Sequence, residues 1–211
     1  MDANQQEFRN PFGMDEACEN CPELCEPRER VVHGYGDVGG EFLVVGTRPT
    51  PAAEANGVPF TGAGGGRRVQ SMFAELGFVR SEPDAVEPDV QNVFFTNLTR
   101  CRHPDRAPTD REVDTCEPFF NAEIRMINPQ IIVPVGERPL RELAVEYTTR
   151  RPDSFDIGDE HATTIRGRGF ELVPMKEPAS MTDGEADAFV EHMRENVLSR
   201  DYRQTKGRQN R

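Results

Sequence analysis

The sequence has almost no lysine and no long apolar run. Only Lys176 and Lys206 are lysine among its 25 basic residues, and the other basic residues are arginine. No apolar stretch is long enough to span a bilayer, and the N-terminal MDANQQEFRN lacks the charged and apolar stretches of a signal peptide. We therefore expect a soluble, cytoplasmic protein with no membrane partner.

Basic charge is also scarce relative to acidic charge. The 211 residues carry 37 acidic and 25 basic side chains, which gives a formal net charge of −12. An acidic surface with little lysine is typical of a cytoplasm at molar salt, where ions screen the repulsion between neighbouring charges. The alternative is a mesophilic acidic protein whose lysine content is low by chance.

The net charge opposes a nucleic-acid partner without excluding one. Phosphate binding normally rests on a basic surface, but counterion release contributes less as salt rises. Charge is also uneven, because the last twelve residues carry a net charge of +4 and the rest carry −16. That basic tail contacts DNA in one interpretation and is a frayed polar terminus in the other.

Four near-continuous apolar runs predict parallel strands that are buried on both faces. These runs are Phe42–Val45, Val93–Leu98, Ile131–Val135 and Phe170–Met175. Amphipathic helix patterns lie between or after them, and two open with capping boxes, at Thr109 with Glu112 and at Thr182 with Glu185. Residues 67–76 and 137–145 supply two further helices. The alternation predicts an α/β fold, a three-layer α/β/α sandwich with a central, mostly parallel four-stranded sheet.

The length fits a single domain with short tails. We place an N-terminal extension at residues 1–17, the domain at 18–199 and the basic tail at 200–211, and we expect a monomer. In a parallel sheet, ligands bind beyond the carboxyl ends of the strands. Polar or Gly/Pro-rich segments follow all four strands, so one edge of the sheet should collect the candidate site residues.

The five cysteines favour a metal site over disulfides, which are rare in large cytoplasmic proteins. Cys18 and Cys21 form a CxxC motif that no strand precedes, which disfavours a thioredoxin-like redox motif. Cys101 follows a strand and Cys116 lies on the inner face of a helix. Four thiolates suit zinc and iron–sulfur clusters equally. We leave Cys25 as the spare thiol, with its replacement of Cys21 as the alternative.

Several motifs of the chain resemble those of the family 4 uracil-DNA glycosylases. The resemblance spans roughly residues 18 to 198 and rests on CENC at 18–21, RVVHGYG at 30–36, VVG at 44–46, GVPFTG at 57–62, TNLTRCRHP at 96–104 with Arg106, Pro108, Glu112 and Cys116, PQIIVPVG at 129–136 and Arg166-Gly167. The resemblance implies a hydrolase that removes uracil, or another damaged base, from DNA. It also implies a 4Fe–4S cluster on Cys18, Cys21, Cys101 and Cys116.

Two positions depart from that family's motifs. Where the family has GE(A/G)PG, this chain has Gly46-Thr47-Arg48-Pro49-Thr50, so the glutamate implicated in catalysis is Thr47. Where the family has HPS, this chain has Glu177-Pro178-Ala179, so the histidine is replaced by Glu177. We therefore name Glu177, Thr47 and Glu54 as candidate catalytic residues, Glu54 because an ungapped match from Gly46 places an acidic residue there.

The remaining motif residues suit recognition of a base that has left the helical stack. The Asn97 amide offers a donor and an acceptor to uracil, Phe60 offers a ring for stacking, and Gly46 joins them as a candidate base-binding residue. Glu177 either acts ionised, stabilising the sugar cation or orienting water, or acts protonated, donating to uracil O2. Arg48 and Lys176 are candidates to bind phosphate or the departing anion.

Three functions from different classes fit these residues. The first is a DNA glycosylase with altered catalytic residues, which we favour because Glu177 can substitute for the missing acid. The second is a catalytically impaired DNA-binding or lesion-sensing protein that keeps the scaffold and the cluster. The third is a redox iron–sulfur protein without a DNA role, which Phe60 and Asn97 disfavour.

Overall fold

The computed structural model describes residues 7–203 and forms an α/β fold around one mixed sheet. The sheet has six strands in the order β1-β3-β2-β4-β6-β5. Their bounds are β1 Tyr35–Gly36, β2 Phe42–Gly46, β3 Val93–Asn97, β4 Ile131–Pro134, β5 Ile165–Arg166 and β6 Glu171–Leu172. The four inner strands are parallel, as the sequence predicts.

The prediction of a four-stranded sheet is wrong in its strand count. β1 pairs antiparallel with β3 at one edge, and β5 pairs antiparallel with β6 at the other. Each edge strand has two residues, which is too short to leave an alternating or apolar pattern in the sequence. The prediction also places the last strand at 170–175, whereas β6 ends at Leu172 and only an isolated bridge between Val135 and Met175 continues the pairing.

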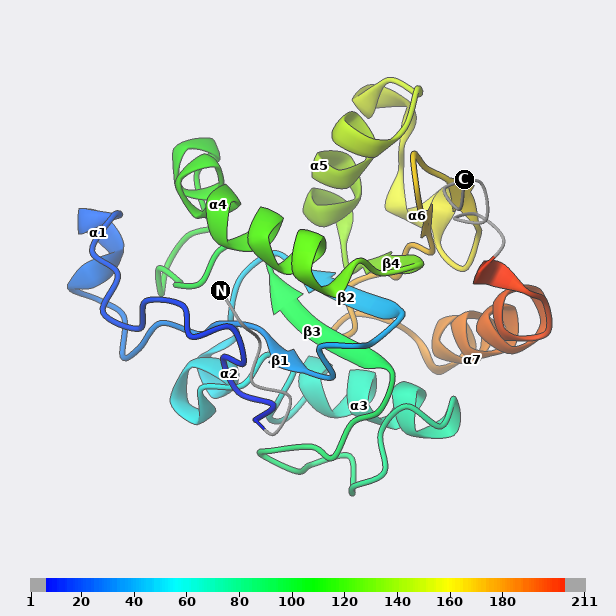
Figure 1. Cartoon of the computed structure of the whole chain (residues 1–211), viewed down its shortest axis with the longest axis horizontal. Coiled ribbons are helices and arrows are strands. Elements are labelled where there is room, and N and C mark those ends of the chain that lie inside the picture. Colours follow the sequence, from blue (N-terminus) through cyan, green and yellow to red (C-terminus); the bar gives the residue numbers. More distant parts are fainter. Residues whose placement is uncertain (1–6, 204–211) are drawn as a thin grey trace.

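Helices cover both faces of the sheet, which gives the three predicted layers (Figure 1). One face carries α4 (Asp110–Ile127) and α5 (Glu137–Tyr147), and the other carries α3 (Gly65–Glu75) and α7 (Asp183–His192), which continues into the π-helical η2 (Met193–Leu198). The shorter helices are α1 Pro22–Cys25, α2 Pro51–Asn56, the 3-10 turn η1 Pro152–Ser154 and α6 Ile157–Glu160. Among the described residues, none of the helices combines the length and apolar character that a membrane span requires.

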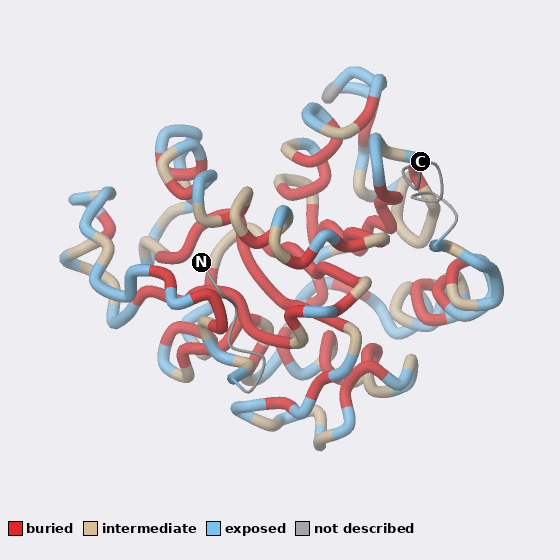
Figure 2. The backbone as a smooth tube through the Cα atoms, in the orientation of Figure 1, coloured by how far each residue is buried: buried red, intermediate tan, exposed pale blue. Residues whose placement is uncertain are grey.

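The core lies on both sides of the sheet because successive strand residues point to opposite faces. In β2, Phe42 and Val44 pack toward α3 and α7, while Leu43 and Val45 pack toward α4 and α5. All four are fully buried, and Figure 2 shows the inner strands as the buried centre of the chain. Burial on both faces explains why the inner strands read as continuous apolar runs.

Capping boxes fix the starts of the two helices that the sequence predicts most clearly. The Thr109 side chain accepts from the Glu112 amide and the Glu112 carboxylate accepts from the Thr109 amide, and Thr182 and Glu185 repeat this arrangement. Each box satisfies amide donors that have no partner within the helix. The predictions of helices starting at Thr109 and Thr182 are therefore confirmed.

Parts of both predicted tails pack against the domain. Phe12 and Met14 are buried, and the Gly36 amide donates to the carbonyl of Phe8. At the other end, Arg200 pairs with Glu171 and Arg203 pairs with Glu41. Two arginines of the predicted basic tail thus have carboxylate partners, and Lys206, Arg208 and Arg211 lie outside the described residues.

Candidate active site at the carboxyl edge of the sheet

A cleft of about 510 Å³ opens at the carboxyl edge of the parallel strands. Its walls come from the segments that follow β2, β3, β4 and β6, together with the loop before α3 and the loop before α4. The lining residues are Gly46, Thr47, Arg48, Pro49, Thr50, Pro51, Phe60, Gly65, Gly66, Asn97, Arg102, Pro104, Ala107, Pro108, Val135, Glu177 and Pro178. Five of the six candidate catalytic and base-binding residues therefore meet in one cleft.

Gly46 and Asn97 end two neighbouring strands at the same level. They are register partners in the parallel pairing of β2 with β3. A Cβ atom at residue 46 would collide with the Asn97 Oδ1 atom and would stand 3.0 Å from the Phe60 ring. Glycine at this position therefore lets the amide and the aromatic ring approach the same side of the cleft.

The Asn97 side chain has an unused hydrogen-bond donor. Only 3% of the residue is exposed, and its Nδ2 atom has no hydrogen-bond partner among the described residues. The backbone carbonyl of Asn97 accepts at 2.7 Å from the Arg100 guanidinium, which holds the end of β3 in place. Because a buried N–H without a partner is costly, this donor is ready for a ligand with an acceptor group.

Phe60 is held in a backbone conformation that favours glycine. Its φ angle is +54°, and its carbonyl accepts at 3.2 Å from Gln70 on α3. The ring lies 5.7 Å from the Phe95 ring, centroid to centroid, and also lines the cleft. A strained residue kept by its surroundings at a cleft wall indicates a functional constraint on the ring's position.

Glu177 is the one acidic residue among the described residues that line the cleft. It follows the bridge between Val135 and Met175, and its Oε2 atom faces Gly136, where a Cβ would stand at 3.3 Å. Although the residue stands at the open rim, the surrounding protein desolvates the carboxyl and raises its pKa above the ordinary range. No described residue forms a hydrogen bond or ion pair with this carboxyl.

Glu54 lies outside the cleft lining, so the structure does not bring it together with the other candidates. Only 3% of Glu54 is exposed, and its carboxylate accepts from Arg102 at 3.1 Å and from the Glu29 amide at 3.3 Å. Its partner Arg102 does line the cleft. Glu54 therefore orients Arg102 and cannot reach a ligand in the cleft itself.

Of the three remaining candidates, Thr47 and Arg48 line the cleft and Lys176 does not. Thr47 lines the cleft with no ionisable group, and its carbonyl accepts from the Thr99 amide at 3.1 Å. Arg48 also lines the cleft, whereas Lys176 is outside the lining and pairs with Glu185. Sequence reasoning missed Arg102, although its place in the segment that follows β3, beside Cys101, was a usable signal.

The four predicted ligand cysteines gather at one end of the molecule. Cys101 and Cys116 are buried, and Cys18 and Cys21 pack beside Leu24, Val31 and Cys101. Burial, together with the nearby Cys116 and Cys18, raises the pKa of the Cys21 thiol to about 11. Burial also raises the pKa of Cys101 to about 11, with contributions from Cys116 and Cys18. The influence of Cys116 and Cys18 on both thiols places the four cysteines in one region of the structure.

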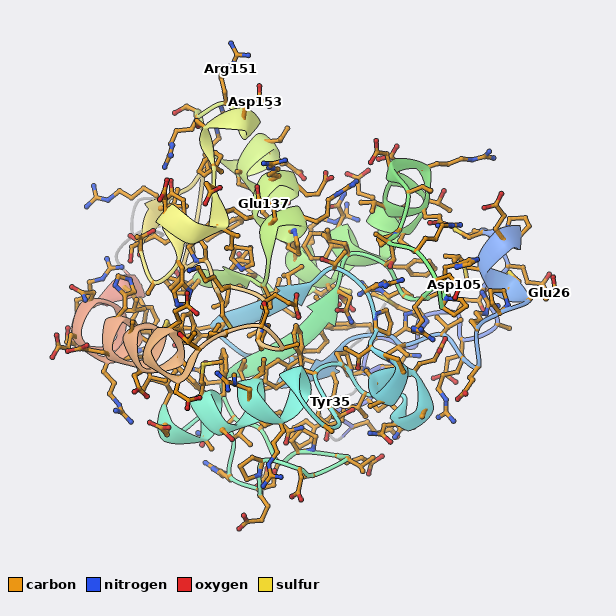
Figure 3. All side chains as sticks on the ribbon, turned by 180° about the vertical axis from the view of Figure 1, so that it is seen from behind. Glu26, Tyr35, Asp105, Glu137, Arg151 and Asp153 are labelled. Atoms are coloured by element: carbon orange, nitrogen blue, oxygen red, sulfur yellow. The ribbon has the colours of Figure 1, made fainter. Side chains whose placement is uncertain are left out.

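Two long-range contacts join the segments that carry these cysteines. Arg106 pairs with Glu23 of α1 at 3.0 Å, and the Arg28 guanidinium lies 3.5 Å from the Cys101 Sγ atom. Figure 3 shows Glu26, just after α1, and Asp105 on the same side of the molecule. Cys25 instead donates to the carbonyl of Cys21 at 3.2 Å.

The cysteine group is not arranged for one metal ion. Within the part of the chain that the structure describes, no three histidine, cysteine or acidic side chains could hold a single ion. A cubane cluster needs a wider ligand set than zinc, because each thiolate binds a different iron. Four cysteines brought to one region of the structure supply the donor set that a 4Fe–4S cluster requires, and the cluster stays a prediction that the family resemblance implies.

The fold and the cleft define an α/β protein with a cleft at the carboxyl edge of its sheet, the edge at which open α/β sheets bind ligands. Residues 33–197 match the model of the Uracil DNA glycosylase superfamily, which covers most of the chain. The chain belongs to the uracil-DNA glycosylase superfamily. The predicted membership of this superfamily is confirmed.

Relatives within this superfamily include proteins named type-4 uracil-DNA glycosylase. The chain is 30% identical to that of Pyrobaculum aerophilum over 152 residues, which cover 72% of this chain and 70% of the relative. It is 31% identical to that of Archaeoglobus fulgidus over 157 residues, 74% of this chain and 69% of the relative. With that of Saccharolobus solfataricus, identity is 26% over 191 residues, 90% of this chain and 80% of the relative.

Proposed function

We propose that this protein hydrolyses the N-glycosidic bond of uracil in DNA. The observation that carries the proposal is the unpartnered Asn97 amide beside the Phe60 ring, in a cleft that also holds Glu177. Membership of the superfamily and the names of the relatives support DNA as the substrate. In the chemistry, the bond between the sugar C1′ atom and uracil N1 breaks, its electron pair leaves with uracil, and a water oxygen bonds to C1′.

Asn97 and Phe60 recognise the base after it leaves the helical stack. The Nδ2–H group of Asn97 donates to uracil O4, and its Oδ1 atom accepts from uracil N3–H. Thymine shares both groups, so its exclusion rests on the fit of its extra methyl group between the ring and the cleft wall. Gly46 leaves the space in which these contacts form.

Glu177 acts as a protonated donor to uracil O2. Its raised pKa supports this role over the ionised one, because desolvation favours the neutral carboxyl. A hydrogen bond to O2 stabilises the negative charge that develops on departing uracil. Thr47, at the position of the family's glutamate, takes no part in proton transfer.

The cysteines Cys18, Cys21, Cys101 and Cys116 hold a 4Fe–4S cluster. Their gathering at one end of the molecule, with the Arg28 guanidinium beside Cys101, supports thiolate ligands there. When bound, the cluster would link the N-terminal segment to the loop after β3 and to α4. We further propose that the acidic, lysine-poor chain works in the cytoplasm of a salt-loving organism.

An excision assay on two variants tests the proposed function. Wild type should release uracil, but not thymine, from a synthetic DNA strand in a single turnover at molar KCl. Asn97→Ala should lower that rate at least tenfold, about 1.4 kcal/mol of transition-state stabilisation. Asn121→Ala, on the outer side of α4, should match wild type. If wild type prefers uracil DNA in binding yet releases no uracil, the protein is a lesion-binding protein instead.

A further inference from the structure

Arg48 is held in the cleft by neutral groups. Its Nη1 atom donates to the carbonyl of His103 at 2.6 Å and to the carbonyl of Arg106. No described Asp or Glu residue pairs with it. Backbone carbonyls orient a guanidinium without neutralising it, whereas a carboxylate would do both. The positive charge of Arg48 is therefore positioned but uncompensated.

The protein surroundings of Arg48 disfavour its charged form. Burial lowers the pKa of Arg48, and the positive charges of Arg102 and Arg106 lower it further. Both neighbours have carboxylate partners, since Arg102 pairs with Glu54 at 3.1 Å and Arg106 pairs with Glu112 at 2.8 Å. Arg106 also pairs with the exposed Glu23, so both neighbours are neutralised while Arg48 has no carboxylate partner among the described residues. A half-buried cation without a counter-ion suits the binding of an anion that arrives with the ligand.

The free edge of the Arg48 guanidinium matches a phosphate. The two carbonyls engage Nη1, and the Nε and Nη2 atoms have no partner among the described residues. These two N–H groups point the same way from one edge of the guanidinium plane, so they can bind two oxygens of one phosphate. Prolines at 49, 51, 104 and 108 line the same cleft and limit the freedom of the surrounding loops.

We propose that Arg48, with Arg102 beside it, binds one phosphodiester of the DNA strand next to the excised nucleotide. This inference rests on the proposed function for its ligand. Both arginines line the cleft that holds Asn97, Phe60 and Glu177, so a nucleotide whose base occupies the cleft brings its backbone phosphates near them. The sequence alone left Arg48 equally suited to the departing uracil anion, and the free bidentate edge favours the phosphate.

Charge-neutral DNA linkages test the proposal on the full-length protein. The probe is a single strand with one 2′-fluoro-deoxyuridine, whose glycosidic bond resists cleavage, and with one methylphosphonate placed at each flanking linkage in turn. At one linkage, the neutral group should weaken wild-type binding about tenfold. The same group should weaken Arg48→Gln binding less than twofold, because the contact is already lost.

The salt dependence of binding supplies a second readout. Loss of one phosphate contact should reduce the slope of log Kd against log salt by about 0.7, the single-strand value per phosphate. Arg48→Lys should keep the slope but bind more weakly, because lysine lacks the bidentate edge. Arg125→Gln is the matched control, because Arg125 also donates to a backbone carbonyl, that of Asn121, far from the cleft.

Three results would overturn the proposal. In the first, Arg48→Gln is as sensitive as wild type to every methylphosphonate. In the second, Arg48→Gln slows uracil release while its methylphosphonate pattern and salt slope stay unchanged, which assigns Arg48 to the departing base. In the third, wild type binds no DNA. Binding that depends on Arg48 and one phosphate, without any uracil release, would refute the proposed excision and leave the phosphate subsite intact.

Discussion

Glu54 and Glu177 are two acidic residues near the cleft, and they differ in whether a basic side chain neutralises them. Glu54 is buried and ion-paired with Arg102. Its carboxylate therefore positions that arginine. Glu177 has no partner among the described residues, and desolvation raises its pKa. This contrast supports a structural role for Glu54 and is the reason why we propose Glu177 as the donor.

His33 links the stability of the fold to pH. It is 4% exposed, and burial lowers its pKa to about 4. Between about pH 6.5 and pH 4 the unfolded chain binds a proton that the folded chain does not, so the free energy of unfolding falls as the pH falls. The full contribution is about 3 kcal/mol.

Denaturant titrations of wild type and His33→Gln at several pH values measure this contribution. The variant cannot titrate at residue 33, so its stability should fall less steeply than that of wild type below pH 6.5. His161 and His192 also have pKa values lowered by burial, and the comparison cancels their shared contribution. Equal slopes for the two proteins would mean that His33 is not held neutral.

At the scale of elements, α4 connects the cysteine end of the molecule to the cleft. Its N-terminus follows the loop that holds Arg48, and it carries Cys116 in its second turn. Glu123 on the same helix is fully buried and accepts from Arg100 at 2.7 Å, and Arg100 in turn donates to the carbonyl of Asn97. One helix therefore carries Cys116, a predicted cluster ligand, and holds the end of the strand that carries Asn97.

Iron analysis of cysteine variants tests the ligand set. Anaerobically purified wild type should be brown, with about four irons per chain. Cys21→Ser should lose the cluster, whereas Cys25→Ser should keep it, because Cys25 donates to a backbone carbonyl. If Cys25→Ser loses the cluster and Cys21→Ser keeps it, Cys25 is the ligand in place of Cys21. A colourless wild type that holds one zinc would contradict the cluster altogether.

The elements that sequence predicts well are those whose signal is local. The capping box at Thr109 and the apolar run of β2 depend on residues close in the chain, and both match the structure. The site at the strand ends was also predictable, because parallel strands end at the same edge. The two-residue edge strands β1 and β5 were not, because their pairing depends on neighbours rather than on their own pattern.

Side-chain direction and distant pairing limited the prediction of the site. Glu54 was assigned by its spacing from Gly46, but it lies on the inner side of α2, where it meets Arg102 across 48 residues of chain. Similarly, the ion pair of Arg100 with Glu123 depends on the register of α4 against β3. No local pattern reports such a register.

The whole molecule carries an excess of negative charge that salt should relieve. The chain has a net charge of −12 and only two lysines. Molar salt shortens the range over which its carboxylates repel one another. The thermal midpoint of unfolding should therefore rise as KCl increases from low to molar concentration. A midpoint that falls or stays constant would contradict the proposed adaptation to salt.

The same excess charge makes the cleft electrostatically distinct. The uncompensated cation of Arg48 and the carboxyl of Glu177, whose pKa is raised by desolvation, both lie in its lining. Under the proposed function, a DNA strand that approaches this acidic protein meets the positive charge of Arg48 in the cleft that takes its base. We propose that uracil is excised in this cleft with Glu177 as the donor.

The single-turnover rate of uracil release from DNA, measured for wild type, Glu177→Gln and Glu177→Ala at molar KCl, tests that claim most directly. Wild type should release uracil from uracil-containing DNA. Gln retains a donor and should keep much of the rate, whereas Ala should lose at least tenfold, about 1.4 kcal/mol. A Gln variant as slow as Ala would show that Glu177 acts ionised. The account is contradicted if wild type releases no uracil, or if both variants match wild type.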